Sequence, residues 1–147
     1  MELGIEGKHI LVSGASRGIG LAIAEAFATE GASVALAARN RLQLEQVTAK
    51  LSGKGRHVSF VGDMSREEDI NQVLNETNRV FGGLDALILN VGGNPSALEF
   101  PVELSEWHRV FELNFAGSAI MATLGMEYLK KSAGNIIFVS SIAGLED

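Results

Sequence analysis

The chain has 147 residues, enough for one domain with a buried core, and its 46% hydrophobic and 20% charged residues are typical of a globular protein. Its net charge of -6 argues against the broad positive surface that nucleic acid requires, and the absence of cysteine excludes disulfides, thiolate metal sites and cysteine nucleophiles. Apolar runs stay well short of the roughly 18 residues of a membrane span, and the acidic N-terminus is unlike a signal peptide, so we expect a cytoplasmic protein.

Apolar runs typical of strands alternate with helical patterns along the chain. The runs are short and apolar on both faces, as in parallel strands buried between helices: His9–Val12, Ser33–Ala38, His57–Val61, Ala86–Leu89 and Asn135–Val139. Helical periods occupy the intervals between them, and the last period runs from Ser105 to about Lys131. Alternating β and α units predict an α/β fold, in which one doubly wound, Rossmann-type domain over residues 1–147 has a parallel sheet of these five strands.

Capping residues mark the ends of the expected helices. Gly31 and Gly82 follow the first and third helical periods as C-terminal stops, and Ser65 with Glu68 forms a capping box before the third. Ser105 is expected to cap the last helix at its N-terminus.

The segment after the first strand carries the most specific functional signal. It places three glycines between an apolar run and a helical period, in the spacing G-x-x-x-G-x-G. A phosphate group binds to backbone N–H groups at the positive end of a helix, and glycine lets the backbone approach closely. No Gly-Lys-Ser/Thr follows, which disfavours a Walker-type loop. We expect this segment to bind the pyrophosphate of a dinucleotide, the alternative being an ordinary tight turn. Its candidate residues are Gly14, Ser16, Arg17, Gly18, Ile19 and Gly20.

Polar or glycine residues also follow the other strands, whose carboxyl ends share the edge of the sheet where ligands bind. Arg39 ends the second run with no adjacent acid, so with Arg17 it favours the 2′-phosphate of NADP, the alternative being two solvated arginines. Asp63 is placed to accept a hydrogen bond from an adenine amino group, or else it is a turn residue. Asn90 and Gly92 let ribose and nicotinamide lie against backbone, or else they form a plain loop.

Two further polar features are weaker signals. Ser140 and Ser141 leave the fifth run, where a hydroxyl can bind a substrate carbonyl, although serines there are more often turn formers. Asn114 lies in the middle of a helical period, where asparagine is unfavourable, so it indicates either a special role or a solvent-facing side chain. The three histidines do not share metal-ligand spacing, and we expect no metal site.

Together these motifs resemble the short-chain dehydrogenase/reductase family. Ser13–Gly20 is similar to its Thr-Gly-x-x-x-Gly-x-Gly turn, with serine for threonine, and the segment from Leu89 to Gly92 is similar to its Asn-Asn-Ala-Gly. The resemblance implies that Arg39 marks an NADP-preferring member and that Asp63 contacts adenine. It also implies that Asn114 supports the proton relay and that Ser141, rather than Ser140, is the catalytic serine.

The chain departs from the family pattern in two places. Leu89 replaces the first asparagine of Asn-Asn-Ala-Gly, and the Tyr-x-x-x-Lys pair, expected beyond Asp147, is absent. Tyr128 is the only tyrosine, and because Ser132 stands four residues later we expect it to serve in packing. We therefore expect an incomplete domain whose C-terminal strands and helices are missing, and which is inactive alone because the family's proton donor is that tyrosine.

The resemblance implies an NADP(H)-dependent oxidoreductase that interconverts a carbonyl and a secondary alcohol by hydride transfer. Its partner is a small-molecule substrate, with no nucleic acid and no membrane. A non-catalytic NADP(H)-binding short form is the alternative. Pairing through the long helix, as in the family, implies a homodimer or homotetramer, and we expect the apolar side of that helix around Phe111, Phe115 and Ile120 to be exposed.

Overall fold

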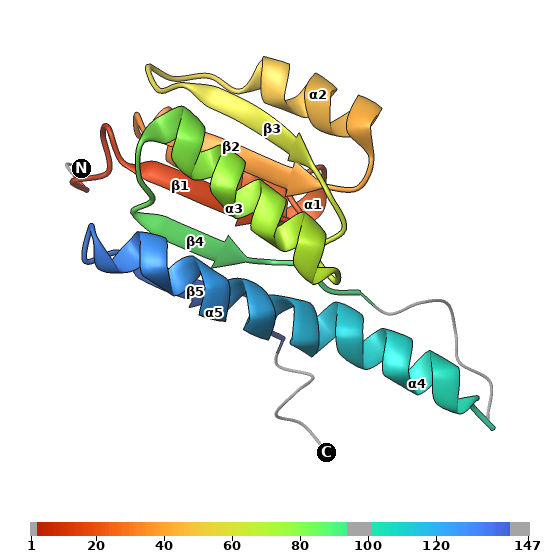
Figure 1. Ribbon diagram of the computed structural model, residues 1–147. Helices are drawn as coiled ribbons and strands as arrows, with labels where there is room; N and C mark the ends of the chain where they lie inside the picture. Colours follow the sequence, from red (N-terminus) through yellow and green to blue (C-terminus); the bar gives the residue numbers. More distant parts are fainter. Residues whose placement is uncertain (1–2, 94–100, 142–147) are drawn as a thin grey trace.

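The five apolar runs form one parallel sheet. The computed structural model describes residues 3–93 and 101–141, and its sheet has the order β3-β2-β1-β4-β5 with every neighbouring pair parallel (Figure 1). The strands are β1 (His9–Ser13), β2 (Ser33–Ala38), β3 (His57–Val61), β4 (Ala86–Leu89) and β5 (Asn135–Phe138). The predicted α/β fold with a doubly wound parallel sheet is confirmed. The strand order reverses between β1 and β4, so a ligand cleft is expected at their carboxyl ends.

Helices cover both faces of this sheet because the strands are apolar on both sides. On one face, α1 (Gly18–Thr29) and α2 (Arg41–Lys50) bury Ala24, Ala28 and Leu44 against alternate residues of β1, β2 and β4. On the other face, α3 (Glu67–Phe81) and α5 (Gly117–Lys130) pack over the remaining strand residues, with Leu74 and Met121 in the same buried cluster. The two clusters give the sheet its two hydrophobic layers.

The predicted strand bounds hold at β2, β3 and β4 and shift slightly at the other two. β1 runs one residue further, to Ser13, whose hydroxyl is buried but hydrogen-bonded. β5 ends at Phe138, one residue early, although the N–H of Val139 still donates to the carbonyl of Leu89 at 2.9 Å. In the centre of the sheet, Ile10 lies opposite Val34 on one side and Ala86 on the other.

Two of the predicted helix caps are wrong. α3 begins at Glu67 after Arg66, and no side chain caps it, because the Ser65 hydroxyl donates to Asp63 instead of taking part in a capping box with Glu68. α4 (Leu104–Phe111) begins one residue before Ser105, with Glu103 at its N-cap and no side-chain hydrogen bond there. The glycine stops are confirmed, since Gly31 and Gly82 both adopt the left-handed conformation at helix ends.

The expected long helix is continuous but not uniform. A π-helical turn, η1 (Glu112–Ala116), joins α4 to α5 and contains Asn114. Figure 1 shows the α4 end of this rod reaching beyond the edge of the sheet, and neither α4 nor η1 contains a buried residue. Within the described ranges, no helix has the length and apolar character needed to cross a membrane.

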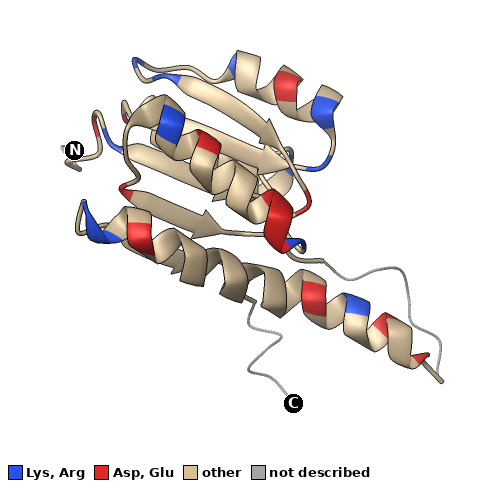
Figure 2. Ribbon diagram, viewed as in Figure 1, with Lys and Arg blue, Asp and Glu red and all other residues tan. Residues whose placement is uncertain are grey.

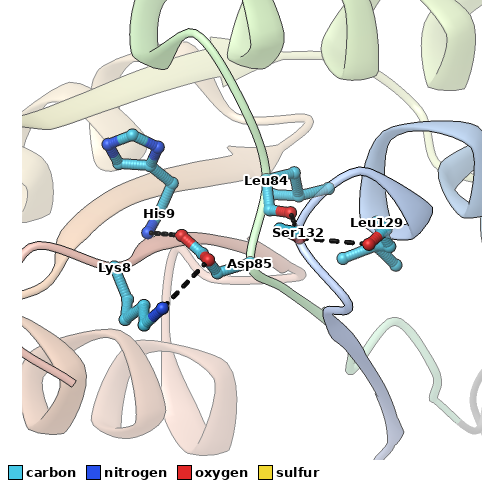
Figure 3. Close-up of polar contacts among 6 residues, drawn as sticks. All are labelled: Lys8, His9, Leu84, Asp85, Leu129 and Ser132. Atoms are coloured by element: carbon cyan, nitrogen blue, oxygen red, sulfur yellow. Dashed lines mark hydrogen bonds and ion pairs between the residues drawn. The ribbon is translucent and has the colours of Figure 1, made fainter. Parts of the chain in front are cut away.

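Polar contacts tie the strands together at their amino ends, opposite the expected cleft. Asp85, just before β4, accepts from the N–H of His9 at 2.9 Å and pairs with the ammonium group of Lys8 at 3.4 Å (Figure 3). Ser132 donates its hydroxyl to the carbonyls of Leu84 at 2.6 Å and Leu129 at 3.1 Å. These contacts fix the starts of β1, β4 and β5 and leave the carboxyl ends to the site.

Candidate functional site

The turn from β1 into α1 forms the centre of the candidate site. Gly14 and Gly18 have φ angles of 63° and 58°, the left-handed region that glycine adopts without strain. Arg17, between them, is extended at the N-cap of α1 and makes no side-chain capping hydrogen bond. The first turn of α1 thus has no side-chain acceptor for its N–H groups, which is the condition for anion binding at a helix N-terminus.

Close packing fixes the shape of this turn. A Cβ atom at Gly20 would lie far inside van der Waals contact with the carbonyl oxygen of Gly14 and against the side-chain amide of Asn90. That amide donates to the Gly14 carbonyl at 3.3 Å. Asn90 is therefore part of the scaffold of the glycine turn.

Ser13 joins the ends of β1 and β4 beneath the turn. Ser13 is 1% exposed, and its hydroxyl donates to the carbonyl of Ile88 at 3.2 Å and accepts from the N–H of Asn90 at 3.0 Å. No separate role for Ser13 was predicted from the sequence. A hydroxyl that ends a buried apolar run directly before a glycine turn is the signal that could have identified it, because such a group must find hydrogen-bond partners.

Asn114 holds the loop that follows β4. Its side chain accepts from the N–H of Gly93 at 2.9 Å and donates to the carbonyl of the same residue at 2.9 Å. It also donates to the carbonyl of Val110, and the π-helical turn sets it within reach of both partners. A Cβ atom at Gly92 would lie 3.0 Å from the Asn114 oxygen. Asn114 is thus exposed, but its side chain is engaged in hydrogen bonds with the loop after β4.

Asp63 and its neighbours form the other end of the site. One carboxylate oxygen accepts from both the N–H of Ser65 at 3.0 Å and its hydroxyl at 2.7 Å. The backbone N–H of Asp63 donates to the carboxylate of Asp69 at 2.7 Å, a positioning contact that was not predicted from the sequence. Figure 2 shows the acidic first turn of α3 at this end of the sheet. The hydrogen bonds from Ser65 thus set the direction of the Asp63 carboxylate.

The surroundings of Asp63 stabilise its negative charge. Burial raises the pKa of the Asp63 carboxyl, but the two hydrogen bonds from Ser65 and the positive charges of Arg39 and Arg66 outweigh burial and lower this pKa below its usual value. Ala38 lies opposite Val61 at the ends of the neighbouring strands β2 and β3, so Arg39 and Asp63 follow at the same rim of the sheet.

We expect Ser65→Ala to lower the free energy of unfolding by about 1 kcal/mol at pH 7, because the lost hydrogen bond joins a hydroxyl and a carboxylate that are only partly buried. A carboxylate whose pKa is lowered by folding contributes stability that is present above its unfolded pKa and is lost as the pH falls through its folded pKa. The difference from the unmodified protein should therefore shrink as the pH falls below about 4. Urea unfolding between pH 3 and pH 7 measures it, and Thr123→Ala, which removes a hydroxyl bonded only to a helix carbonyl, should show no such pH dependence.

The remaining candidate residues lie on the same rim. Ser16 is half-buried, Arg17 and Arg39 are exposed, and Ile19 is 65% exposed in spite of its size. Ser141 is described and exposed, three residues beyond the end of β5. The rest of the segment that resembles the family's catalytic serine motif, residues 142–144, lies outside the described residues.

Other ionisable groups lie apart from this rim in packing positions. Tyr128 donates its hydroxyl to Asn75 at 2.6 Å across α5 and α3, and burial and the nearby charge of Glu127 raise its pKa. Burial lowers the pKa of His57. Among residues 3–93 and 101–141, no cluster of three histidine, aspartate or glutamate side chains could hold a metal ion.

Proteins similar to this chain include dehydrogenases and reductases. A family profile described as short chain dehydrogenase matches residues 8–147. L-fucose dehydrogenase of Bos taurus is 36% identical over 140 residues, which cover 94% of this chain and 50% of that protein. Glucose 1-dehydrogenase of Gluconobacter oxydans is 37% identical over 141 residues, covering 92% of this chain and 53% of that protein. The crystal structure of L-sorbose reductase from Gluconobacter frateurii, complexed with NADPH and L-sorbose, superposes with a TM-score of 0.93 at 30% identity and covers 99% of this chain and 56% of that one.

The parallel sheet with helices on both faces defines a Rossmann-type α/β fold. The chain belongs to the short-chain dehydrogenase family, as its motifs indicated. It spans about half the length of the curated relatives it matches.

Proposed function

We propose that the chain is the cofactor-binding part of an NADP(H)-dependent oxidoreductase that interconverts a carbonyl and a secondary alcohol. The observation that carries this proposal is the glycine turn that opens α1. Its helix N-terminus has no side-chain cap, and a Cβ atom at Gly18 would meet nothing within 4 Å. The open space in front of the turn fits a pyrophosphate group bound by backbone N–H groups.

The residues on the rim then take distinct roles. Gly14, Ser16, Gly18, Ile19 and Gly20 surround the pyrophosphate, and Arg17 and Arg39 bind the 2′-phosphate. Asp63 accepts from the adenine amino group, while Asn90 and Gly92 shape the wall beside ribose and nicotinamide. Ser141 orients the substrate carbonyl, and Asn114 organises the proton relay. The bound cofactor supplies the hydride chemistry.

The choice of NADP(H) over NAD(H) rests on the charges at the end of β2. Arg39 is exposed there, it lies close enough to Asp63 to lower the pKa of that carboxyl, and Arg17 stands at the neighbouring end of β1. Guanidinium groups bind phosphate through charge-assisted, often bidentate hydrogen bonds. The NADPH bound to the sorbose reductase supports the same choice.

We expect the protein to bind NADPH more tightly than NADH, and Arg39→Asp to reverse that order. The substitution removes a contact worth about 1.5–3 kcal/mol and adds a carboxylate that repels the 2′-phosphate and accepts from ribose hydroxyls. Fluorescence titration with both cofactors measures the two affinities. Arg41→Asp is the control, because Arg41 is the first residue of α2 and pairs with Glu45 one turn later. This variant should still bind NADPH more tightly than NADH. Equal affinities for both cofactors before and after Arg39→Asp would reject the assignment.

The second candidate is a non-catalytic NADP(H)-binding short form. This candidate needs the glycine turn and the rim, and it needs no proton donor. Both candidates predict cofactor binding, and they differ in what the gene encodes downstream. A Tyr-x-x-x-Lys within about twenty codons after Asp147 supports the oxidoreductase, and a stop codon supports the short form. For either candidate we propose a cytoplasmic protein that associates as a homodimer or homotetramer, and for the enzyme a small-molecule carbonyl or alcohol as substrate.

A further inference from the structure

The long helix rests on backbone, not on side chains, where it passes the Asp63 loop. Gly117 is buried at the start of α5. A Cβ atom there would lie far inside van der Waals contact with the carbonyl oxygen of Met64, and 3.1 Å and 3.2 Å from the Met64 carbonyl carbon and the Ser65 Cα. Because these are backbone atoms and Met64 is 4% exposed, they cannot rotate away as a side chain could. Only glycine allows this approach.

The same stretch of helix also holds the loop on the other side of the site. Asn114 stands three residues before Gly117 in the same continuous helical segment. Asn114 exchanges two hydrogen bonds with Gly93 in the loop after β4, while Gly117 lies on the loop after β3 that carries Asp63. These two loops belong to strands that are not neighbours, since β2 and β1 lie between them. One helical turn thus spans the two ends of the proposed cofactor cleft.

We propose that Gly117 is a positioning residue that couples the adenine end of the cleft to the nicotinamide end. Gly117 sets the distance between the long helix and the Asp63 loop. Because Asn114 belongs to the same helical segment, a shift of the helix also moves Asn114 and its hydrogen-bond partner Gly93. The expected effect on the affinity for NADPH rests on the proposed function. The mechanical link between Met64, Gly117, Asn114 and Gly93 stands on contacts within the protein alone.

Gly125 shows that not every glycine of this helix is placed in this way. It is buried two turns further along α5, and its Cβ atom would meet only side-chain atoms, Leu87 Cδ2 at 2.7 Å and Leu74 Cδ2 at 3.7 Å. Those leucine side chains can adjust their rotamers. Gly125→Ala therefore adds the same methyl group to the same helix without moving the helix from a loop of the site, and it is the matched control.

The test compares Gly117→Ala with Gly125→Ala in the full-length protein, with amide hydrogen exchange and NADPH titration as readouts. The added methyl group must part helix and loop by on the order of 1 Å, a displacement that costs up to about a hundredfold when it misplaces a functional group. We expect the Gly93 amide of Gly117→Ala to exchange at least about fivefold faster, relative to the core amide of Leu87, and NADPH to bind about tenfold more weakly. Gly125→Ala should leave both the relative exchange rate of the Gly93 amide and the affinity for NADPH unchanged.

The reverse experiment covers the case in which Gly117→Ala does not fold. Asn114 is exposed, and Asn114→Ala removes the bonds to Gly93 without touching the Met64 contact. Coupling is reciprocal, so the Ser65 amide, bonded to Asp63, should then exchange about fivefold faster as well. An unchanged Ser65 amide in Asn114→Ala, or an unchanged Gly93 amide in a folded Gly117→Ala, overturns the coupling. Faster exchange in a protein that binds no NADPH would uphold the coupling and reject the proposed function.

Discussion

Gly18→Val is expected to abolish NADPH binding, with a loss of affinity greater than about a hundredfold, or roughly 2.7 kcal/mol. Gly18 stands at the start of α1, where a Cβ atom would project into space that no protein atom fills within 4 Å. In the proposed complex the pyrophosphate occupies that space, and a branched side chain excludes it. Isothermal titration with NADPH measures the loss.

Backbone strain must be separated from this steric effect. Gly18 has a φ of 58°, where a residue with a side chain is strained by about 1–2 kcal/mol, so Gly18→Val should also lower the free energy of unfolding. Gly82 is a matched control, because it has a φ of 76° and open space around its Cβ position, but it ends α3 at the opposite edge of the sheet. Gly82→Val should lose similar stability and keep its NADPH affinity. Near-normal titration of a folded Gly18→Val protein would remove the glycine turn from the site.

The sheet could be predicted from the sequence because burial on both faces leaves a clear signal. The bounds of β2, β3 and β4 follow directly from apolar runs between turn residues. Ser13 was not predicted to belong to a strand, because its hydroxyl is satisfied by Ile88 and Asn90, which are far from it in the sequence. A pattern of neighbouring apolar residues does not predict such a contact.

The helix caps failed for a related reason. Ser65 has the composition of a capping residue, but its hydroxyl bonds to Asp63, and the competition between two local acceptors is decided by the fold. The π-helical turn at Glu112–Ala116 left only one trace, an asparagine at an unfavourable position. The glycine at position 117 was a second trace, because a glycine within a helical period often marks a close approach of two backbones.

The candidate site was predicted as a set of strand ends, and the structure adds their connections. Parallel strands bring Arg39 and Asp63 to the same edge by topology alone, as expected. The hydrogen bonds of Asn90 to Gly14 and of Asn114 to Gly93 depend on loop conformations that no periodicity encodes. Ile120, expected to be exposed, is instead half-buried against the cluster beneath α5, because it lies beyond the π-helical turn where the helix has reached the sheet.

The exposed face of the projecting helix leads to the second large effect, on self-association. Leu104, Trp107, Phe111 and Phe115 are 68%, 51%, 59% and 59% exposed, and they recur every three or four residues on one side of the rod. The rings of Phe111 and Phe115 pack against each other, with their centroids 5.0 Å apart. A continuous apolar stripe of this kind favours burial against another surface. A second copy of the same helix offers a stripe of the same length and character, as expected for a symmetric dimer.

Phe111→Glu is therefore expected to weaken self-association by at least about a hundredfold, as measured by sedimentation equilibrium over a range of concentrations. In a two-fold interface each substitution occurs twice, and the two introduced carboxylates lose water where two phenyl rings were packed. Leu42 is the matched control, since it is 73% exposed but stands alone on α2, and Leu42→Glu should leave the dissociation constant unchanged. Phe111 lies on α4, which has no buried residue, so loss of its ring should not unfold the domain. A protein that is monomeric before any substitution, or equal effects of the two variants, would show that the stripe serves another purpose.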